Sequence, residues 1–127
     1  SPCLQRVRKL RQSGYISDVT AILNLKKIAN FVTVYCQIRL SEQTVRQFSV
    51  FEAAIARIPE AVECGMTGGE YDYILKFVVR DMDHFSELST LMMEMDIGIK
   101  NISFNVEVKK VKSAFEMPLR ALLDKKR

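Results

Sequence analysis

Apolar and polar residues alternate along the chain from Phe31 to residue 40. Apolar side chains at every second position are typical of a strand with one packed face, because successive side chains of a strand point to opposite sides. The alternating apolar positions are Val32, Val34, Cys36, Ile38 and Leu40. This pattern predicts a first strand.

The apolar period then lengthens to three or four residues, which is the period of a helix with one buried face. Ser41 stands where a helix N-cap is expected, and Pro59 is expected to stop the helix. The apolar stripe consists of Val45, Phe48, Phe51, Ile55 and Ile58. A second helix is expected after Asp81 or Asp83, with the stripe Phe85, Leu88, Leu91, Met92 and Met95.

Strand patterns fill the intervals between and after these helices. Val62, Cys64 and Met66 alternate before the turn Thr67-Gly68-Gly69, a second alternating run extends from Tyr71 to Arg80, and a last strand is expected from Ile99 to about Val111. The predicted order is strand, helix, strand, strand, helix, strand over residues 31–112. This βαββαβ order is that of an α+β, ferredoxin-like fold with two helices on one face of a four-stranded antiparallel sheet.

The run from Tyr73 to Val79 is apolar on both faces, because Ile74 and Val78 oppose the set that includes Leu75 and Phe77. Helices cover only one face of such a sheet. We therefore expect a homodimer in which the other face meets a second copy. The alternative is a monomer in which residues 15–25 or the C-terminal tail fold over that face.

Three further segments flank the predicted domain. Leu4, Val7 and Leu10 mark a short helix that ends at Gly14, within residues 1–14. Residues 15–30 form a predicted hinge strand and linker, and residues 113–127 form a C-terminal tail.

Composition agrees with a folded domain and excludes several classes of protein. The chain has 127 residues, of which 48% are hydrophobic and 27% charged, and no apolar run reaches the ~20 residues of a membrane span. Cys3, Cys36 and Cys64 are far apart, which favours structural thiols over disulfides or a metal site. We expect a cytoplasmic protein that does not bind membranes and needs neither a metal nor a cofactor.

The excess positive charge lies at the N-terminus. The net charge is +4, and residues 1–16 hold Arg6, Arg8, Lys9 and Arg11 without an acidic residue, so the remainder carries 15 basic and 15 acidic residues. The first helix is therefore the candidate for contact with a polyanion.

Enzymatic and RNA-binding functions have weak support. His84 is the only histidine, and no nucleophile and base are suitably spaced. RNA-recognition domains share this strand order, and Tyr71, Tyr73 and Phe77 share one face, but the residues that precede them are Gly69-Glu70 where the RNA motif is basic. A single-stranded RNA-binding module therefore remains a minor alternative.

Three stretches of the chain resemble the Lrp/AsnC family of feast/famine transcription regulators. They are Arg6-Val7-Arg8-Lys9-Leu10 followed by Ser13-Gly14-Tyr15-Ile16, then Pro59 to Cys64, and Gly69-Glu70-Tyr71-Asp72-Tyr73-Ile74-Leu75-Lys76. The resemblance implies a helix-turn-helix, a hinge strand and a ferredoxin-like effector domain that dimerises through its sheet, with further assembly to a tetramer or octamer. It also implies that residues 3–12 are most of a DNA recognition helix, with Arg6, Arg8, Lys9 and Arg11 as DNA contacts, whose preceding helices are absent from this chain.

The resemblance further implies a site for an amino acid or related metabolite, without a cofactor, near the glycine turn and at contacts between dimers. The implied effector residues are Thr67, Gly68, Gly69, Glu70, Tyr71, Asp72 and Phe104. The glycine amides suit a carboxylate, and Glu70 or Asp72 suits an ammonium group. Two alternatives stay open: the turn and Asp72 serve only the hairpin, or the domain assembles without a ligand. Where the family commonly has two threonines, this chain has Ile102 and Phe104, so the identity of the ligand is also open.

Overall fold

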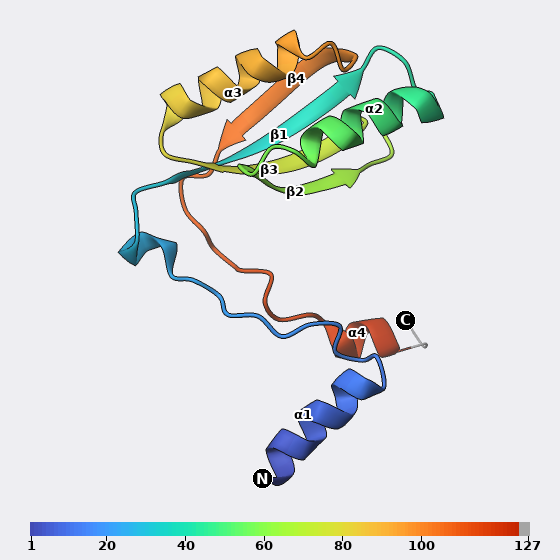
Figure 1. The fold of residues 1–127 in the computed structure, drawn as a ribbon, viewed down its shortest axis with the longest axis vertical. Coiled ribbons are helices and arrows are strands. Elements are labelled where there is room, and N and C mark those ends of the chain that lie inside the picture. Colours follow the sequence, from blue (N-terminus) through green and yellow to red (C-terminus); the bar gives the residue numbers. More distant parts are fainter. Residues whose placement is uncertain (125–127) are drawn as a thin grey trace.

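A computed structural model describes residues 1–124 and shows one antiparallel sheet with two helices on one face (Figure 1). The strands lie in the order β2-β3-β1-β4, and the ferredoxin-like prediction is confirmed. The domain consists of β1 (Val32–Leu40), α2 (Val45–Ile55), β2 (Ala61–Met66), β3 (Tyr73–Val79), α3 (Met82–Glu94) and β4 (Ile99–Val106).

The core lies between the sheet and the two helices. Every second residue of β3, from Tyr73 to Val79, is buried, as the alternating pattern predicted. The Tyr73 ring packs on Phe51 of α2 with ring centroids 4.4 Å apart, and Phe77 packs on Phe85 of α3 at 5.6 Å. Both helices therefore cover the same face of β3, and burying each such side chain stabilises the fold by about 1.5–3 kcal/mol.

Tyr73 also carries a polar group into this core. Its hydroxyl donates a hydrogen bond of 2.6 Å to Glu52 Oε2 on α2. Burial, followed by this contact with Glu52, raises the pKa of Tyr73. The tyrosine therefore stays neutral, and its hydrogen bond links β3 to α2.

The first helix of the domain begins later than expected. Thr44 is the N-cap of α2, and its side chain accepts a hydrogen bond of 3.1 Å from the Gln47 N–H. The predicted cap, Ser41, instead donates its N–H to the Gly98 carbonyl at 2.8 Å and so extends the pairing of β1 with β4. The Ser41 prediction was wrong because a sheet contact competes for that residue.

The last strand is shorter than predicted. β4 ends at Val106, which pairs with Val34, and Glu107 makes one more backbone bond to Thr33. Beyond this point β1 has not yet begun, so the chain has no strand to pair with, and Val108 is 98% exposed. The expected continuation to Val111 was therefore wrong.

Two arms extend from the domain (Figure 1). The N-terminal arm holds α1 (Pro2–Gln12), which Gly14 follows at φ +85° as predicted, and a short 3₁₀ turn at Leu25–Lys27. The C-terminal arm holds α4 (Leu119–Leu123), which the sequence pattern did not predict. In the described chain, which holds a single copy, residues 15–24 form no strand. The hinge strand expected within residues 15–30 stays a prediction.

The sheet face opposite the helices is open. Neither arm covers this face in the described chain, because both run away from the sheet in Figure 1 and their apolar residues are exposed. Ile74 of β3 is 42% exposed here and Tyr35 of β1 is 37% exposed. Polar side chains such as Gln37 and Lys76 share the face, so it is mixed rather than uniformly dry.

Candidate functional site

The connection between β2 and β3 is a closed turn from Thr67 to Asp72. The Thr67 N–H donates to the Asp72 carbonyl at 2.9 Å, and the Thr67 hydroxyl donates to the Tyr71 carbonyl at 3.0 Å. Gly69 takes φ +120°, a backbone conformation that glycine adopts without steric cost. Apart from the glycine itself and its two chain neighbours, no atom lies within 4 Å of the place where a Cβ would stand on Gly68 or Gly69, and both residues are exposed.

Asp72 ties this turn to the end of β1. It is only 8% exposed, and its Oδ2 accepts hydrogen bonds from the Leu40 N–H at 2.8 Å and from Gln43 Nε2 at 3.2 Å. Its own N–H donates to the Ile38 carbonyl at 2.9 Å. The carboxylate therefore satisfies groups of its own chain, which favours the hairpin-tying interpretation of Asp72.

Arg39 connects β1 to the same turn from the open face of the sheet. Its Nη1 donates to the Glu70 carbonyl at 2.9 Å and lies 3.9 Å from Asp72 Oδ1. The side chain remains 36% exposed. A guanidinium has five N–H donors in a planar fork that matches a carboxylate, so most of its donors stay free for a ligand.

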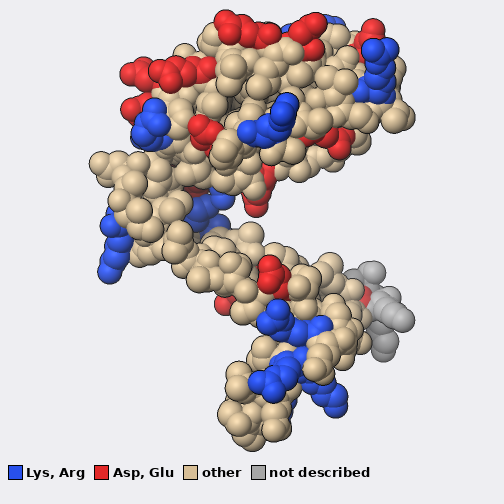
Figure 2. Space-filling view, viewed as in Figure 1, with Lys and Arg blue, Asp and Glu red and all other residues tan. Residues whose placement is uncertain are grey.

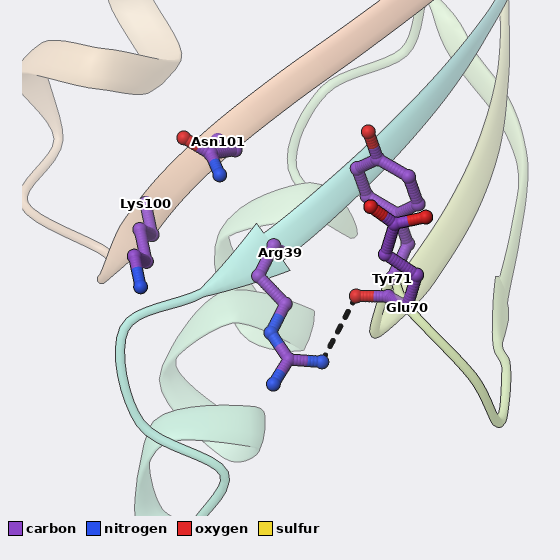
Figure 3. Close-up of a pocket in the computed structure, with 5 residues that line it drawn as sticks. All are labelled: Arg39, Glu70, Tyr71, Lys100 and Asn101. Carbon is purple, nitrogen blue, oxygen red and sulfur yellow. Dashed lines mark hydrogen bonds between the residues drawn. The ribbon is translucent and has the colours of Figure 1, made fainter.

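A pocket of about 280 Å³ opens beside the turn and is lined by Arg39, Glu70, Tyr71, Lys100 and Asn101. Figure 3 shows Arg39 between the β4 residues Lys100 and Asn101 on one side and the turn residues Glu70 and Tyr71 on the other. Two of the predicted effector residues, Glu70 and Tyr71, therefore line the pocket. Thr67, Gly68 and Gly69 build the turn beside them.

Sequence reasoning missed Arg39, Lys100 and Asn101. Arg39 pairs with Asn101 across the β1–β4 ladder, and it reaches Glu70, which is 31 positions away in the sequence. The alternation along β1 does place Arg39 on the face opposite the core. That signal could have identified an outward-facing cation, but not its neighbours.

Phe104 does not belong to this pocket. It pairs with Cys36, whose side chain is fully buried toward the helices, and the Phe104 ring lies 5.1 Å from the ring of Phe85 on α3. Phe104 is nevertheless 49% exposed because β4 is an edge strand. Residue parity along β4 directs this side chain to the helix face, away from the pocket, so a role for Phe104 in effector binding stays a prediction.

The four predicted DNA contacts lie on α1. Arg6, Arg8, Lys9 and Arg11 are all exposed, and no residue of α1 is buried. Figure 2 shows the positive side chains gathered on this arm, whereas acidic side chains are prominent on the upper part of the visible domain face. The basic helix thus lies apart from the pocket beside the β2–β3 turn.

The thiols of Cys36 and Cys64 are not activated for chemistry. Burial raises the pKa of the Cys36 thiol to about 11 and also raises that of Cys64, so neither is an activated nucleophile. No cluster of metal-ligating side chains occurs in residues 1–124, and no helix of that part is long and apolar enough to cross a membrane.

Tyr73 and Phe77 are at most 1% exposed beneath the helices, so they cannot stack on RNA bases.

The domain is ferredoxin-like, has a charged pocket at a glycine turn and is joined to a basic helix on a separate arm. Comparison with known proteins places it among the ligand-binding domains of transcription regulators. Residues 33–117 match the family model of the Lrp/AsnC ligand binding domain. The chain belongs to the Lrp/AsnC family.

Similar proteins of known sequence are transcription regulators. Transcriptional regulatory protein DoeX of Halomonas elongata is 34% identical over 112 residues, which cover 88% of this chain and 71% of that protein. The leucine-responsive regulatory protein of Salmonella typhimurium is 30% identical over 120 residues, which cover 94% of this chain and 73% of that protein.

Solved structures share the fold over nearly the whole chain. An AsnC family transcriptional regulator from Agrobacterium tumefaciens has a TM-score of 0.84 and 28% identity, covering 97% of this chain and 80% of that one. The transcriptional regulator NMB0573 from Neisseria meningitidis, solved as a complex with L-Met, has a TM-score of 0.84 and 24% identity over 97% of this chain and 79% of that one.

Proposed function

We propose that an amino acid or a related small metabolite binds in the pocket beside the β2–β3 turn and that this chain passes the signal to DNA-binding segments through its assembly. The observation that carries the proposal is a pocket in which a cation and a carboxylate face the same small volume, at Arg39 and Glu70. An amino acid is a zwitterion, so it carries the two opposite charges that this lining can meet.

The chemistry of the two ends of such a ligand matches the lining. The α-carboxylate accepts charge-assisted hydrogen bonds from the free donors of Arg39, with the exposed residues Gly68 and Gly69 close by in the turn. The α-ammonium donates to the exposed carboxylate of Glu70. L-Met in the Neisseria regulator and the name of the leucine-responsive relative support an amino acid as the effector.

The signal requires an assembly that the ligand biases. We propose a homodimer through the open sheet face, where Ile74, Val78 and Tyr35 supply the apolar contact that neither arm covers in the described chain. Dimers then meet near the pocket and form a tetramer or octamer. A ligand that binds one assembly more tightly than another shifts the population between them.

DNA binding is assigned to the N-terminal arm. Arg6, Arg8, Lys9 and Arg11 suit phosphate contacts, which position a protein on DNA without reading its sequence. The protein would act without catalysis and in the cytoplasm, where a regulator of this kind meets DNA.

Assembly without any ligand is the second candidate. It is favoured by Asp72, whose carboxylate already binds Leu40 and Gln43 and so leaves fewer groups for an effector. In this case the pocket is only a feature of the turn, and assembly alone spaces the DNA-binding segments.

A melting experiment with each of the twenty amino acids separates the two candidates. A ligand at 100 times its dissociation constant adds about 2.7 kcal/mol of stability and raises the melting temperature by several degrees. Stabilisation by one chemical class supports sensing. A chain that none of the twenty stabilises has assembly as its only supported role.

A further inference from the structure

A β-bulge delivers Lys100 to the ligand pocket. Leu40 pairs with Ile99 and Arg39 pairs with Asn101, so Lys100 is an extra residue in β4 that has no partner on β1. In a regular strand, the neighbours Lys100 and Asn101 would point to opposite faces of the sheet. Bulges redirect side chains, and here both consecutive residues line the same pocket.

The groups brought together in this way are free to bind. Within residues 1–124, the side chains of Lys100, Asn101 and Glu70 make no hydrogen bond or ion pair, whereas Arg39 bonds the turn carbonyl of Glu70 and lies 3.9 Å from Asp72 Oδ1. Asp72 lies behind Arg39 and does not line the pocket. Lys100 is therefore a cation of the pocket whose side chain makes no ion pair within the described residues.

The lining contains no aliphatic side chain from the described chain, since its five residues are two cations, a carboxylate, an amide and a tyrosine. Once Arg39 holds the α-carboxylate and Glu70 the α-ammonium, Tyr71, Lys100 and Asn101 remain to face the side chain of the ligand, and the two from β4 present a cation and an amide. An aliphatic side chain there would displace water from Lys100 and offer it no hydrogen-bond acceptor.

We infer, resting on the proposed function, that Lys100 is a specificity-determining residue that selects amino acids with a carboxylate in the side chain. Lys100 supplies a charge-assisted hydrogen bond to that second carboxylate, and Asn101 donates a neutral one. The preferred ligands are thus L-aspartate and L-glutamate, ahead of their amides and of leucine or methionine.

Calorimetric titration of the whole chain tests this inference. The parent is titrated with L-aspartate, L-glutamate, L-asparagine, L-glutamine, L-leucine and L-methionine, and so are Lys100→Gln and the matched control Lys109→Gln. Lys109 is an exposed lysine beyond the far end of β4. Lys100→Gln should lower the affinity for the dicarboxylic amino acids about tenfold to hundredfold, as expected for the loss of one charge-assisted hydrogen bond. It should change the affinity for asparagine and glutamine little. Lys109→Gln should bind each amino acid with the affinity of the parent.

Two results would overturn the role of Lys100 while leaving amino-acid sensing intact. One is tighter binding of leucine or methionine than of aspartate and glutamate by the parent, and the other is undiminished binding of the acidic pair by Lys100→Gln. Melting curves show that each variant is folded before it is titrated. A parent that binds none of the six and that no other amino acid stabilises would overturn the proposed function itself.

Discussion

At the scale of single residues, the hydrogen-bond partners of Asp72 could not be predicted from the sequence. The pattern placed it on a turn and left open whether it serves a ligand or the hairpin. Its partner Leu40 is 32 positions away, and no local pattern encodes a hydrogen bond over that distance. The same limit hid Arg39 and Lys100, whereas Glu70 and Tyr71, which line the pocket, were expected at the site because the sequence of the turn resembles that of the family.

Replacement of Asp72 is expected to destabilise the protein. In Asp72→Ala the buried Leu40 N–H loses its acceptor, which costs about 1–3 kcal/mol and lowers the melting temperature by several degrees. Thermal melts of the ligand-free protein measure this loss.

Glu70→Ala is the matched control, because Glu70 is an exposed carboxylate of the same turn with no side-chain partner in residues 1–124. It should melt like the parent and bind amino acids more weakly. An Asp72→Ala protein that melts at the parent temperature would show that the hydrogen bonds of Asp72 contribute little to the fold.

At the scale of elements, the sequence predicted the type and order of every strand and helix in the domain but not all of their ends. Periodicity reports which face is buried, and this was sufficient for β3, whose alternate residues are buried. The start of α2 and the end of β4 depend on where a neighbouring strand offers a partner, as Ser41 and Val108 show. Those partners come from distant parts of the chain.

The start of α3 is predicted to make stability sensitive to acid. Asp81 caps the helix by accepting from the His84 N–H at 2.8 Å, and His84 Nε2 lies 2.8 Å from Glu60 Oε2. Because His84 Nδ1 accepts from the Arg80 N–H, Nε2 is the nitrogen that donates to Glu60. This hydrogen bond is the main cause that lowers the pKa of Glu60.

A carboxyl group with a lowered pKa in the folded state stabilises the protein above its ordinary pKa of about 4.3, and this stability is lost as the pH falls through the lowered value. The contribution is below about 1 kcal/mol because the pair is partly exposed. Urea unfolding at a series of acidic pH values should show that the free energy of unfolding falls less steeply with decreasing pH for Glu60→Gln than for the parent. Identical pH profiles would contradict a stabilising role for this pair.

At the scale of the whole molecule, a single copy leaves one sheet face open and the apolar residues of both arms exposed. The sequence predicted the open face from the two-sided apolar pattern of β3, and the structure identifies Ile74 and Val78 as its outward residues and Phe77 as buried. Alternation along β1 also puts polar side chains such as Gln37 on this face, but that Gln37 lies beside Ile74 depends on the register of the two strands and could not be predicted.

A charge on the open face should break the dimer. Ile74→Asp places a carboxylate in the proposed contact, where burying an unpaired ion is strongly unfavourable, so light scattering should report monomers at micromolar concentration. Val45→Asp is the control, because Val45 is 81% exposed on α2, on the helix side of the sheet. A monomeric parent, or an Ile74→Asp protein as dimeric as the parent, would contradict this interface.

The central claim is that the pocket at the β2–β3 turn binds an amino acid through Arg39. The most direct measurement is the melting temperature of the parent, Arg39→Ala and Arg46→Ala with and without each amino acid at millimolar concentration. Arg46 is the matched control, since it is exposed on α2 outside the pocket. The account predicts that one class of amino acid stabilises the parent and Arg46→Ala by several degrees and leaves the melting temperature of Arg39→Ala unchanged, because the α-carboxylate has lost its main partner. Equal stabilisation of all three proteins, or of none, would contradict it.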